Sequence, residues 1–102
     1  IYARGVELLQ KRKYAKALYI LNDYNDRNTV VAHLSLDHNE RAMELLATMP
    51  KDAVTEYLRA IACSRLGRKA EGREHFLEAC RLDGRMEYRG NLDPEIAELL
   101  KQ

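Results

Sequence analysis

The chain has 102 residues, and its 17 Lys and Arg residues against 16 Asp and Glu residues give a formal charge of +1. A charge this close to zero excludes global electrostatic attraction to nucleic acid or to an anionic membrane. Hydrophobic residues make up 46% of the chain, too many for a disordered protein, and no apolar run is long enough to span a bilayer. Because the sequence starts at Ile1 and its helical pattern begins at once, we expect a small globular piece of a longer chain.

In the first half of the chain, apolar residues recur at spacings of three and four, which predicts short amphipathic helices. A first helix ends at the polar turn 11–13, and a second follows directly. We expect Asn28 to cap a third helix over 29–36 and Asn39 to cap a fourth, which Pro50 ends.

The longest predicted helix comes next, over 53–66. We expect Asp52 to begin it and Gly67 to end it, because glycine adopts the left-handed conformation without a side-chain clash. A further amphipathic helix is predicted over 69–82.

The C-terminal stretch 85–92 has no apolar period, and we expect it to be a loop. Asp93 followed by Pro94 then indicates the start of a last short helix, because proline is favoured at the first helical position. Its apolar residues are expected to cap the end of the fold, and they are Ile96, Leu99 and Leu100. No stretch alternates with period two, so the predicted class is all-α, with seven helices.

The predicted helices form pairs that repeat a pattern. Each second helix has a small residue at the same place: Ala17, Ala42 and Gly72. A large apolar residue follows four positions later: Leu21, Leu46 and Phe76. Three positions further stand Tyr24, Met49 and Ala79. A small residue lets the partner helix approach closely, and the large residue fills the space one turn later.

The third pair resembles a tetratricopeptide repeat. The resemblance rests on Tyr57, Ala60, Leu66, Gly67, Gly72, Phe76, Ala79, Leu82 and Asp83. This pair has Gly84 where the family has proline, and Gly72 where the family usually has alanine. The first pair fits more loosely, through Gly5, Leu8, Tyr14, Ala17 and Leu21. The small residues are 25 and 30 positions apart, against ~34 in the standard repeat, so the second pair is shortened.

The resemblance implies one domain over 1–102, a right-handed α–α superhelix of three helix pairs with a C-terminal capping helix. The expected parts are a first pair 1–26, a shortened second pair 27–50, a third pair 51–84, and a loop with the capping helix over 85–102. Together with the preceding helix pair, the tail 89–96 is similar to the helical C-terminal segments of some larger bacterial cell-envelope proteins. That second resemblance implies a location in the bacterial envelope or periplasm.

We expect no catalytic centre, metal site or cofactor. His33 and His38 are five residues apart across a predicted turn, whereas a helical metal pair needs a spacing of about four and further ligands. Ser35, Asp37 and His38 contain the residue types of a catalytic triad, but neighbours on one turn cannot align nucleophile, base and orienting group. No glycine-rich phosphate-binding loop is present.

The two cysteines, Cys63 and Cys80, both fall within predicted helices. Free cysteine usually behaves as a small buried hydrophobic residue, and this is the reading that we expect here. A bridge between them would need facing Cβ atoms, which a sequence does not reveal.

The expected function is non-catalytic protein–protein interaction or scaffolding. In tetratricopeptide-like stacks, the first helix of each pair lines a concave face, and the resemblance therefore implies a partner-binding surface for a protein or peptide segment. Its candidate residues are Tyr2, Gln10, Leu34, Tyr57, Ser64 and Arg65. Peptide-carboxylate clamping by Lys and Asn is not expected, because the matching positions carry other residues.

Two alternatives stay open. The chain could be a structural spacer or a homodimerisation element, which uses its truncated first pair as the contact. It could instead bind nucleic acid through basic turns, since Arg65, Arg68, Lys69 and Arg73 cluster around one turn and 11–13 forms another. A steep salt dependence of binding would favour the nucleic-acid reading, and a concentration-dependent mass would favour the dimer.

Overall fold

The computed structural model of the protein describes residues 1–101, and over that range its regular structure is helical only. This confirms the all-α class. The chain divides into two compact units, Ile1–Ala47 (unit 1) and Thr48–Gln102 (unit 2). The division falls near the end of the second predicted pair, and each unit has its own packing.

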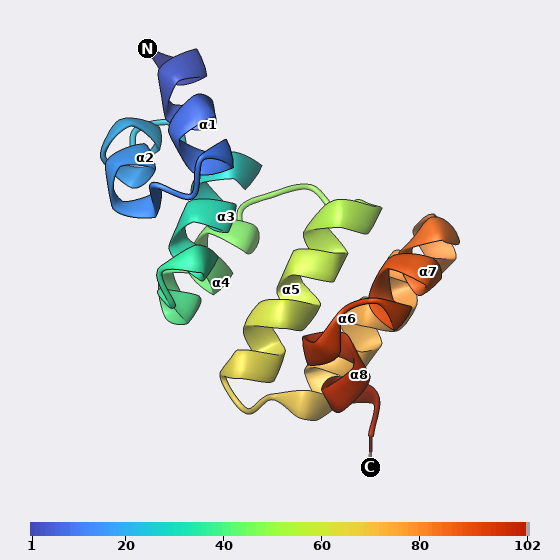
Figure 1. The fold of residues 1–102 in the computed structure, drawn as a ribbon. Helices are drawn as coiled ribbons and strands as arrows, with labels where there is room; N and C mark the ends of the chain where they lie inside the picture. Colours follow the sequence, from blue (N-terminus) through green and yellow to red (C-terminus); the bar gives the residue numbers. More distant parts are fainter. Residues whose placement is uncertain (102) are drawn as a thin grey trace. The chain divides into compact units, whose positions relative to one another are not determined.

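Unit 1 contains four short helices that pack in chain order, α1 with α2, α2 with α3 and α3 with α4 (Figure 1). They are α1 (Tyr2–Gln10), α2 (Tyr14–Leu21), α3 (Arg27–Ser35) and α4 (Asn39–Leu46). Leu8, Ala17 and Leu21 form the core between α1 and α2.

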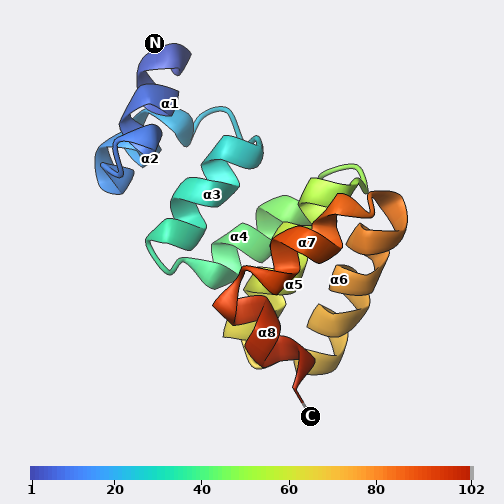
Figure 2. The ribbon, with the colours of Figure 1, turned by 45° about the vertical axis from the view of Figure 1, so that its right-hand side comes forward.

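Unit 2 is built on one long hairpin with two short helices against it. Its helices are α5 (Ala53–Arg65), α6 (Lys69–Leu82), α7 (Arg85–Asn91) and α8 (Pro94–Leu100). The α5–α6 hairpin is the main packing contact, and α8 touches α5, α6 and α7 (Figure 2). The core centres on Tyr57, Phe76, Ile96 and Leu99.

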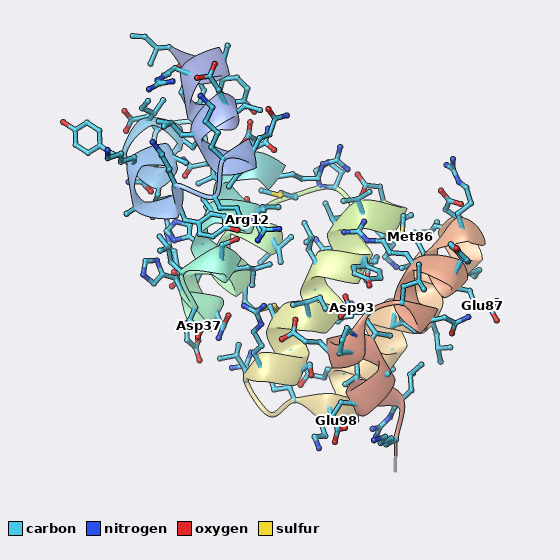
Figure 3. The ribbon with its side chains drawn as sticks, in the orientation of Figure 1. Arg12, Asp37, Met86, Glu87, Asp93 and Glu98 are labelled. Carbon is cyan, nitrogen blue, oxygen red and sulfur yellow. The ribbon has the colours of Figure 1, made fainter. Side chains whose placement is uncertain are left out.

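The two helices of each hairpin, α1–α2, α3–α4 and α5–α6, are joined by a turn of the same kind. The residue with positive φ is Arg12 (61°), Asp37 (62°) or Gly67 (78°), five positions before the small residue of each second helix. Arg12 and Asp37 are labelled in Figure 3. In each turn the next backbone N–H donates to a carbonyl five residues back: Lys13 to Leu8 (2.9 Å), His38 to His33 (2.8 Å) and Arg68 to Cys63 (2.9 Å). This is the hydrogen bond of a Schellman cap, which satisfies carbonyls at a helix end.

The predicted small and large positions of the repeat are all buried. The small set is Ala17, Ala42 and Gly72, and the large set is Leu21, Leu46 and Phe76. The third position is buried only in the last hairpin, at Ala79. Tyr24 and Met49 lie beyond the ends of α2 and α4, because these helices are shorter than the pattern predicts.

Helix caps differ from the prediction at two places. Asp26, and not Asn28, caps α3: its carboxylate accepts the Thr29 backbone N–H at 3.1 Å, in a capping box. Asn39 begins α4 instead of capping it, and His38 precedes it without a side-chain cap. At α5 the prediction is confirmed, since Asp52 forms a second capping box with Thr55.

The stretch 85–92, expected as a loop, contains helix α7. Its buried face has only Met86 and Gly90, so no apolar period marks it in the sequence. Position 90 has no room for a side chain, because a Cβ there would lie 2.5 Å from the Phe76 ring. Asp93 caps α8 as predicted, and Ile96 and Leu99 are fully buried. Leu100, expected to share this role, is 42% exposed.

Within the part of the chain that the structure describes, no helix is both long enough and apolar enough to cross a membrane.

Candidate binding site

Unit 1 carries an open pocket of about 830 Å³ beside α2. One wall is a face of α2 and the residues just after it; the other is the end of α3 with the following turn. The lining residues are Ala15, Leu18, Tyr19, Asn22, Asp23, His33, Leu36 and His38. This volume lies within the range of about 300–1,000 Å³ that is typical of ligand sites.

The pocket follows from how α2 packs. This helix buries Ala17 and Leu21 in the core that it shares with α1. Ala15, Leu18 and Tyr19 therefore lie on another face, and Tyr19 is 88% exposed. An aromatic ring with so little protein around it offers contact area that the fold itself does not use.

The opposite wall consists of Leu36 and a pair of histidines. His33 Nδ1 and His38 Nδ1 are 3.0 Å apart. His33 is only 6% exposed, and its Nε2 has no hydrogen-bond partner among the described residues. Burial lowers the pKa of His33, and the nearby His38 and Arg41 lower it further.

The repeated turn shows that this histidine occupies a core position. The residues four positions before the three positive-φ residues are Leu8, His33 and Cys63, and all three are buried. The residues directly after the positive-φ residues are Lys13, His38 and Arg68. The fold needs only an apolar side chain four positions before the positive-φ residue, because Leu8 and Cys63 occupy this position in the other two hairpins.

The predicted partner-binding residues of unit 1 do not line this pocket. The Tyr2 hydroxyl donates to the Asp26 carboxylate and accepts from Asn28 Nδ2 at 2.7 Å, which ties α1 to the start of α3. Gln10 is exposed at the end of α1. Leu34 is buried, so its side chain contributes to packing.

In unit 2, two of the predicted residues contact the chain's own C-terminal segment. Tyr57 is 2% exposed, and its hydroxyl donates to Asp93 Oδ2 at 2.7 Å. Asp93 is labelled in Figure 3. Arg65 donates to both carboxylate oxygens of Glu95, at 2.8 and 3.1 Å. Ser64 is half-buried beside them in sequence. Helix α8 and its capping residue therefore contact this side of α5 and cover Tyr57, while Arg65 stays exposed.

The Tyr57 ring is held on two further sides. The Arg89 guanidinium lies 4.3 Å from its centroid, and the Phe76 ring packs against it edge-on at 6.1 Å. Burial and the hydrogen bond to Asp93 raise the pKa of Tyr57. In this structure Tyr57 is a core residue that anchors the C-terminal segment.

A buried ionic cluster that the sequence analysis missed lies between α5 and α6. The Glu56 carboxylate is almost fully buried; it pairs with Arg59 at 2.8 Å and with His75 Nδ1. Arg59 also donates to the Met49 carbonyl at 3.0 Å. Arg59 and His75 thus satisfy the buried Glu56 carboxylate, and Arg59 also holds the segment before α5 in place. The role of this cluster is structural.

The cysteines are both free: Cys63 is buried, as expected, and Cys80 is half-buried. Burial raises the pKa of both thiols, so each remains protonated and weakly nucleophilic at neutral pH.

Three basic residues of the alternative nucleic-acid surface have acidic or carbonyl partners. Lys11 pairs with Glu7 at 3.3 Å, Arg65 pairs with Glu95, and Arg73 donates to the Leu99 carbonyl at 3.3 Å. These contacts compete with phosphate for the same donors.

Comparisons with protein-family models, curated proteins and solved structures find no match for this chain.

The pocket itself was not predicted. Tyr19 was overlooked because it lies off the apolar stripe of its helix. His33 could have been found, because aligning the turns places it with Leu8 and Cys63.

Proposed function

We propose that this chain is a non-catalytic, tetratricopeptide-like interaction module, and that unit 1 binds a protein segment in the pocket beside α2. The observation that carries the proposal is Tyr19, an 88% exposed aromatic side chain on the wall of a pocket of about 830 Å³. Exposed aromatic residues at such places often supply much of the binding energy of an interface.

The repeated hairpin supports the tetratricopeptide-like reading. Three turns with the same hydrogen bond precede three second helices that bury a small residue and then a large one. Stacked helical repeats bind their partners on extended exposed surfaces. The surface proposed here differs from the first-helix face that the resemblance implies, because Ala15, Leu18 and Tyr19 lie on α2, the second helix of its pair.

The chemistry of the walls defines the segment that fits. Ala15, Leu18 and Leu36 form an aliphatic surface that accepts one apolar anchor side chain. Asn22 and Asp23 offer oxygen acceptors at the same pocket, so the segment needs a hydrogen-bond donor or a positive charge near its anchor. An amphipathic segment that combines both groups is the expected ligand.

The experiment is a selection of peptides from a random display library on the wild-type chain, followed by affinity measurements on variants. Tyr19→Ala is expected to weaken the selected peptides by more than about tenfold, which corresponds to ~1.4 kcal/mol. The matched control is Tyr88→Ala, which removes another exposed tyrosine from α7 in unit 2 and should leave affinity unchanged.

Equal affinity of the wild type and Tyr19→Ala would overturn the proposed site. A mass that rises with protein concentration in the absence of peptide, and that Tyr19→Ala abolishes, would replace the proposal by homodimerisation through the same face.

A further inference from the structure

The histidine pair of unit 1 is not explained by the fold. The equivalent positions of the other two hairpins carry Leu8 and Lys13, or Cys63 and Arg68. Both members of the pair therefore depart from the repeat, and both departures are to imidazole. Imidazole is the side chain whose charge ordinarily changes between about pH 5 and pH 8.

The two rings meet nitrogen to nitrogen in a hydrogen bond. Their Nδ1 atoms are 3.0 Å apart while their centroids are 5.3 Å apart, so the rings point at each other and do not stack. The turn holds them there, because the His38 backbone N–H donates to the His33 carbonyl at 2.8 Å and Asp37 between them has a φ of 62°. A single proton lies between the two nitrogens: one ring donates it and the other accepts it.

This contact allows one added proton on the pair but not two. His38 is exposed, and a first proton on its ring leaves the shared proton, and so the hydrogen bond to His33, in place. A second proton has to bind His33, and a charged imidazole donates from both of its nitrogens. Two N–H groups would then face each other across 3.0 Å, and both rings would be positive.

The burial of His33 makes a charge on its ring costly. The residue is only 6% exposed, and its Nε2 is buried without a hydrogen-bond partner among the described residues. A positive His33 would therefore have two N–H groups in the fold with nothing to accept either of them. A buried charge without a partner is strongly unfavourable.

The charged groups around the His33 ring do not compensate for such a proton. Arg41 faces the ring from α4, and the second ring of the pair faces it from the turn; both oppose a further positive charge. From α2, Tyr19 and Asp23 line the same pocket, but both are exposed, and solvent screens the Asp23 carboxylate. From α1, Tyr2 contacts the beginning of α3, about two helical turns before the ring.

We propose that the His33–His38 pair makes the α3–α4 hairpin acid-sensitive: when both rings are protonated they separate, and the turn that forms one wall of the pocket opens. Burial lowers the pKa of His33 from its ordinary value of 6.5, so the closed hairpin binds this proton less readily than the open one. The stabilisation of the closed hairpin by the uncharged His33 is therefore present above about pH 6.5. It is lost as the pH falls from there toward the pKa of His33 in the folded state.

The proposal does not depend on peptide binding, and amide hydrogen exchange of the full chain tests it without a ligand. Exchange is read by mass spectrometry at about pH 7 and about pH 5.5, on either side of the ordinary histidine pKa. After correction for the intrinsic effect of pH on exchange, the rates give the opening equilibrium of residues 27–46.

Three variants separate the roles of the histidines. His33→Leu installs the residue of the first hairpin, Leu8, and so keeps the packing of the turn. His38→Gln keeps a hydrogen-bonding group that does not take up a proton. His75→Gln removes the remaining histidine, in unit 2, as the matched control. Circular dichroism at about pH 7 checks that each variant is folded.

We expect the opening equilibrium constant of residues 27–46 to rise about three- to tenfold from the higher to the lower pH, in the wild type and in His75→Gln. It should change less than about twofold in His33→Leu. His38→Gln should respond less than the wild type, because its amide oxygen accepts the Nδ1–H of a protonated His33.

Equal opening of the wild type at the two pH values, or a full pH response in folded His33→Leu, would overturn the proposal. A full response in His38→Gln would assign the effect to the burial of His33 alone and would overturn the role of the pair.

Discussion

At the scale of single residues, Tyr57 shows how one polar atom anchors a helix. Its hydroxyl donates a hydrogen bond to Asp93, the residue that caps α8. Tyr57→Phe keeps the ring against Phe76 and Arg89 but removes this hydrogen bond. We expect the free energy of unfolding to fall by about 1 kcal/mol, measured by urea denaturation. An unchanged midpoint would show that the bond contributes nothing.

The same residue makes stability depend on alkaline pH. The pKa of Tyr57 is raised above its ordinary value of 10.0, so the unfolded chain loses this proton at a lower pH than the folded chain. The stabilisation that comes from the protonated Tyr57 hydroxyl is complete below about pH 10 and is lost as the pH rises toward the pKa of Tyr57 in the folded state. Wild type and Tyr57→Phe should therefore converge in stability above pH 10. A difference that is constant with pH would contradict the assignment.

His33 is the opposite case, a polar residue that the fold would be more stable without. Its Nε2 is buried and unpaired, and such groups cost about 1–3 kcal/mol. His33→Leu places an apolar side chain at a position where Leu8 already serves in the first hairpin. The variant also loses the hydrogen bond with His38, so we expect a net gain of about 1 kcal/mol in the free energy of unfolding, measured by urea denaturation. A loss of stability would mean that the histidine pair holds the turn together.

At the scale of elements, α7 depends on a glycine. A Cβ at Gly90 would lie 2.5 Å from two atoms of the Phe76 ring and 3.2 Å from Ile96. Gly90→Ala should therefore destabilise unit 2 by about 1–3 kcal/mol through overpacking. Gly84→Ala is the matched control, because nothing lies within 4 Å of its Cβ position. Equal thermal midpoints for the two variants would refute this role of Gly90.

The shared turn makes a second prediction at this scale. Gly67 has a φ of 78°, which costs a residue with a side chain about 1–2 kcal/mol. Gly67→Ala should lower the stability of unit 2 by this amount. Arg12→Gly, at the equivalent turn, should act in the opposite direction but more weakly, because glycine also gains entropy in the unfolded chain. Thermal denaturation monitored by circular dichroism measures both, and a rise for Gly67→Ala would contradict a left-handed turn.

Sequence reasoning succeeded where local chemistry decides the structure. Apolar period located most helices, Asp52 and Asp93 were identified as caps, and Gly67 was identified as a stop. It failed at α7, where the buried face is one methionine and one glycine. The sequence analysis missed the cap at Asp26 because Asn28, two residues later, is an equally good capping residue. Only the fold shows that the Asn28 side-chain amide donates to the Tyr2 hydroxyl.

At the scale of the whole molecule, unit 2 has a core of its own. The residues of its hydrophobic cluster, from Tyr57 to Leu99, all come from within it. Its first helix is capped by Asp52 and Thr55, which also belong to it. We expect residues 48–102 alone to fold to a helical state that unfolds cooperatively in urea. A gradual, uncooperative loss of helical signal would show that this unit needs residues 1–47.

The candidate site could not be read from the sequence because it depends on which helix face is left over after packing. Nothing in the period of α2 distinguishes the exposed Tyr19 from an ordinary surface residue. Conversely, Tyr57 is of a residue type that is common in binding interfaces, yet the C-terminal segment covers it. Side-chain type was informative, but exposure was decided by elements distant in the sequence.

The most direct test of the proposed binding site is a nuclear magnetic resonance titration of the ¹⁵N-labelled chain with a selected peptide. The account predicts that amide shifts change at residues 15–23 and 33–38, around Tyr19 and the histidine pair, while those of unit 2 stay fixed. Changes centred on Gln10, Ser64 and Arg65 would contradict this site and restore the surface first expected from the sequence.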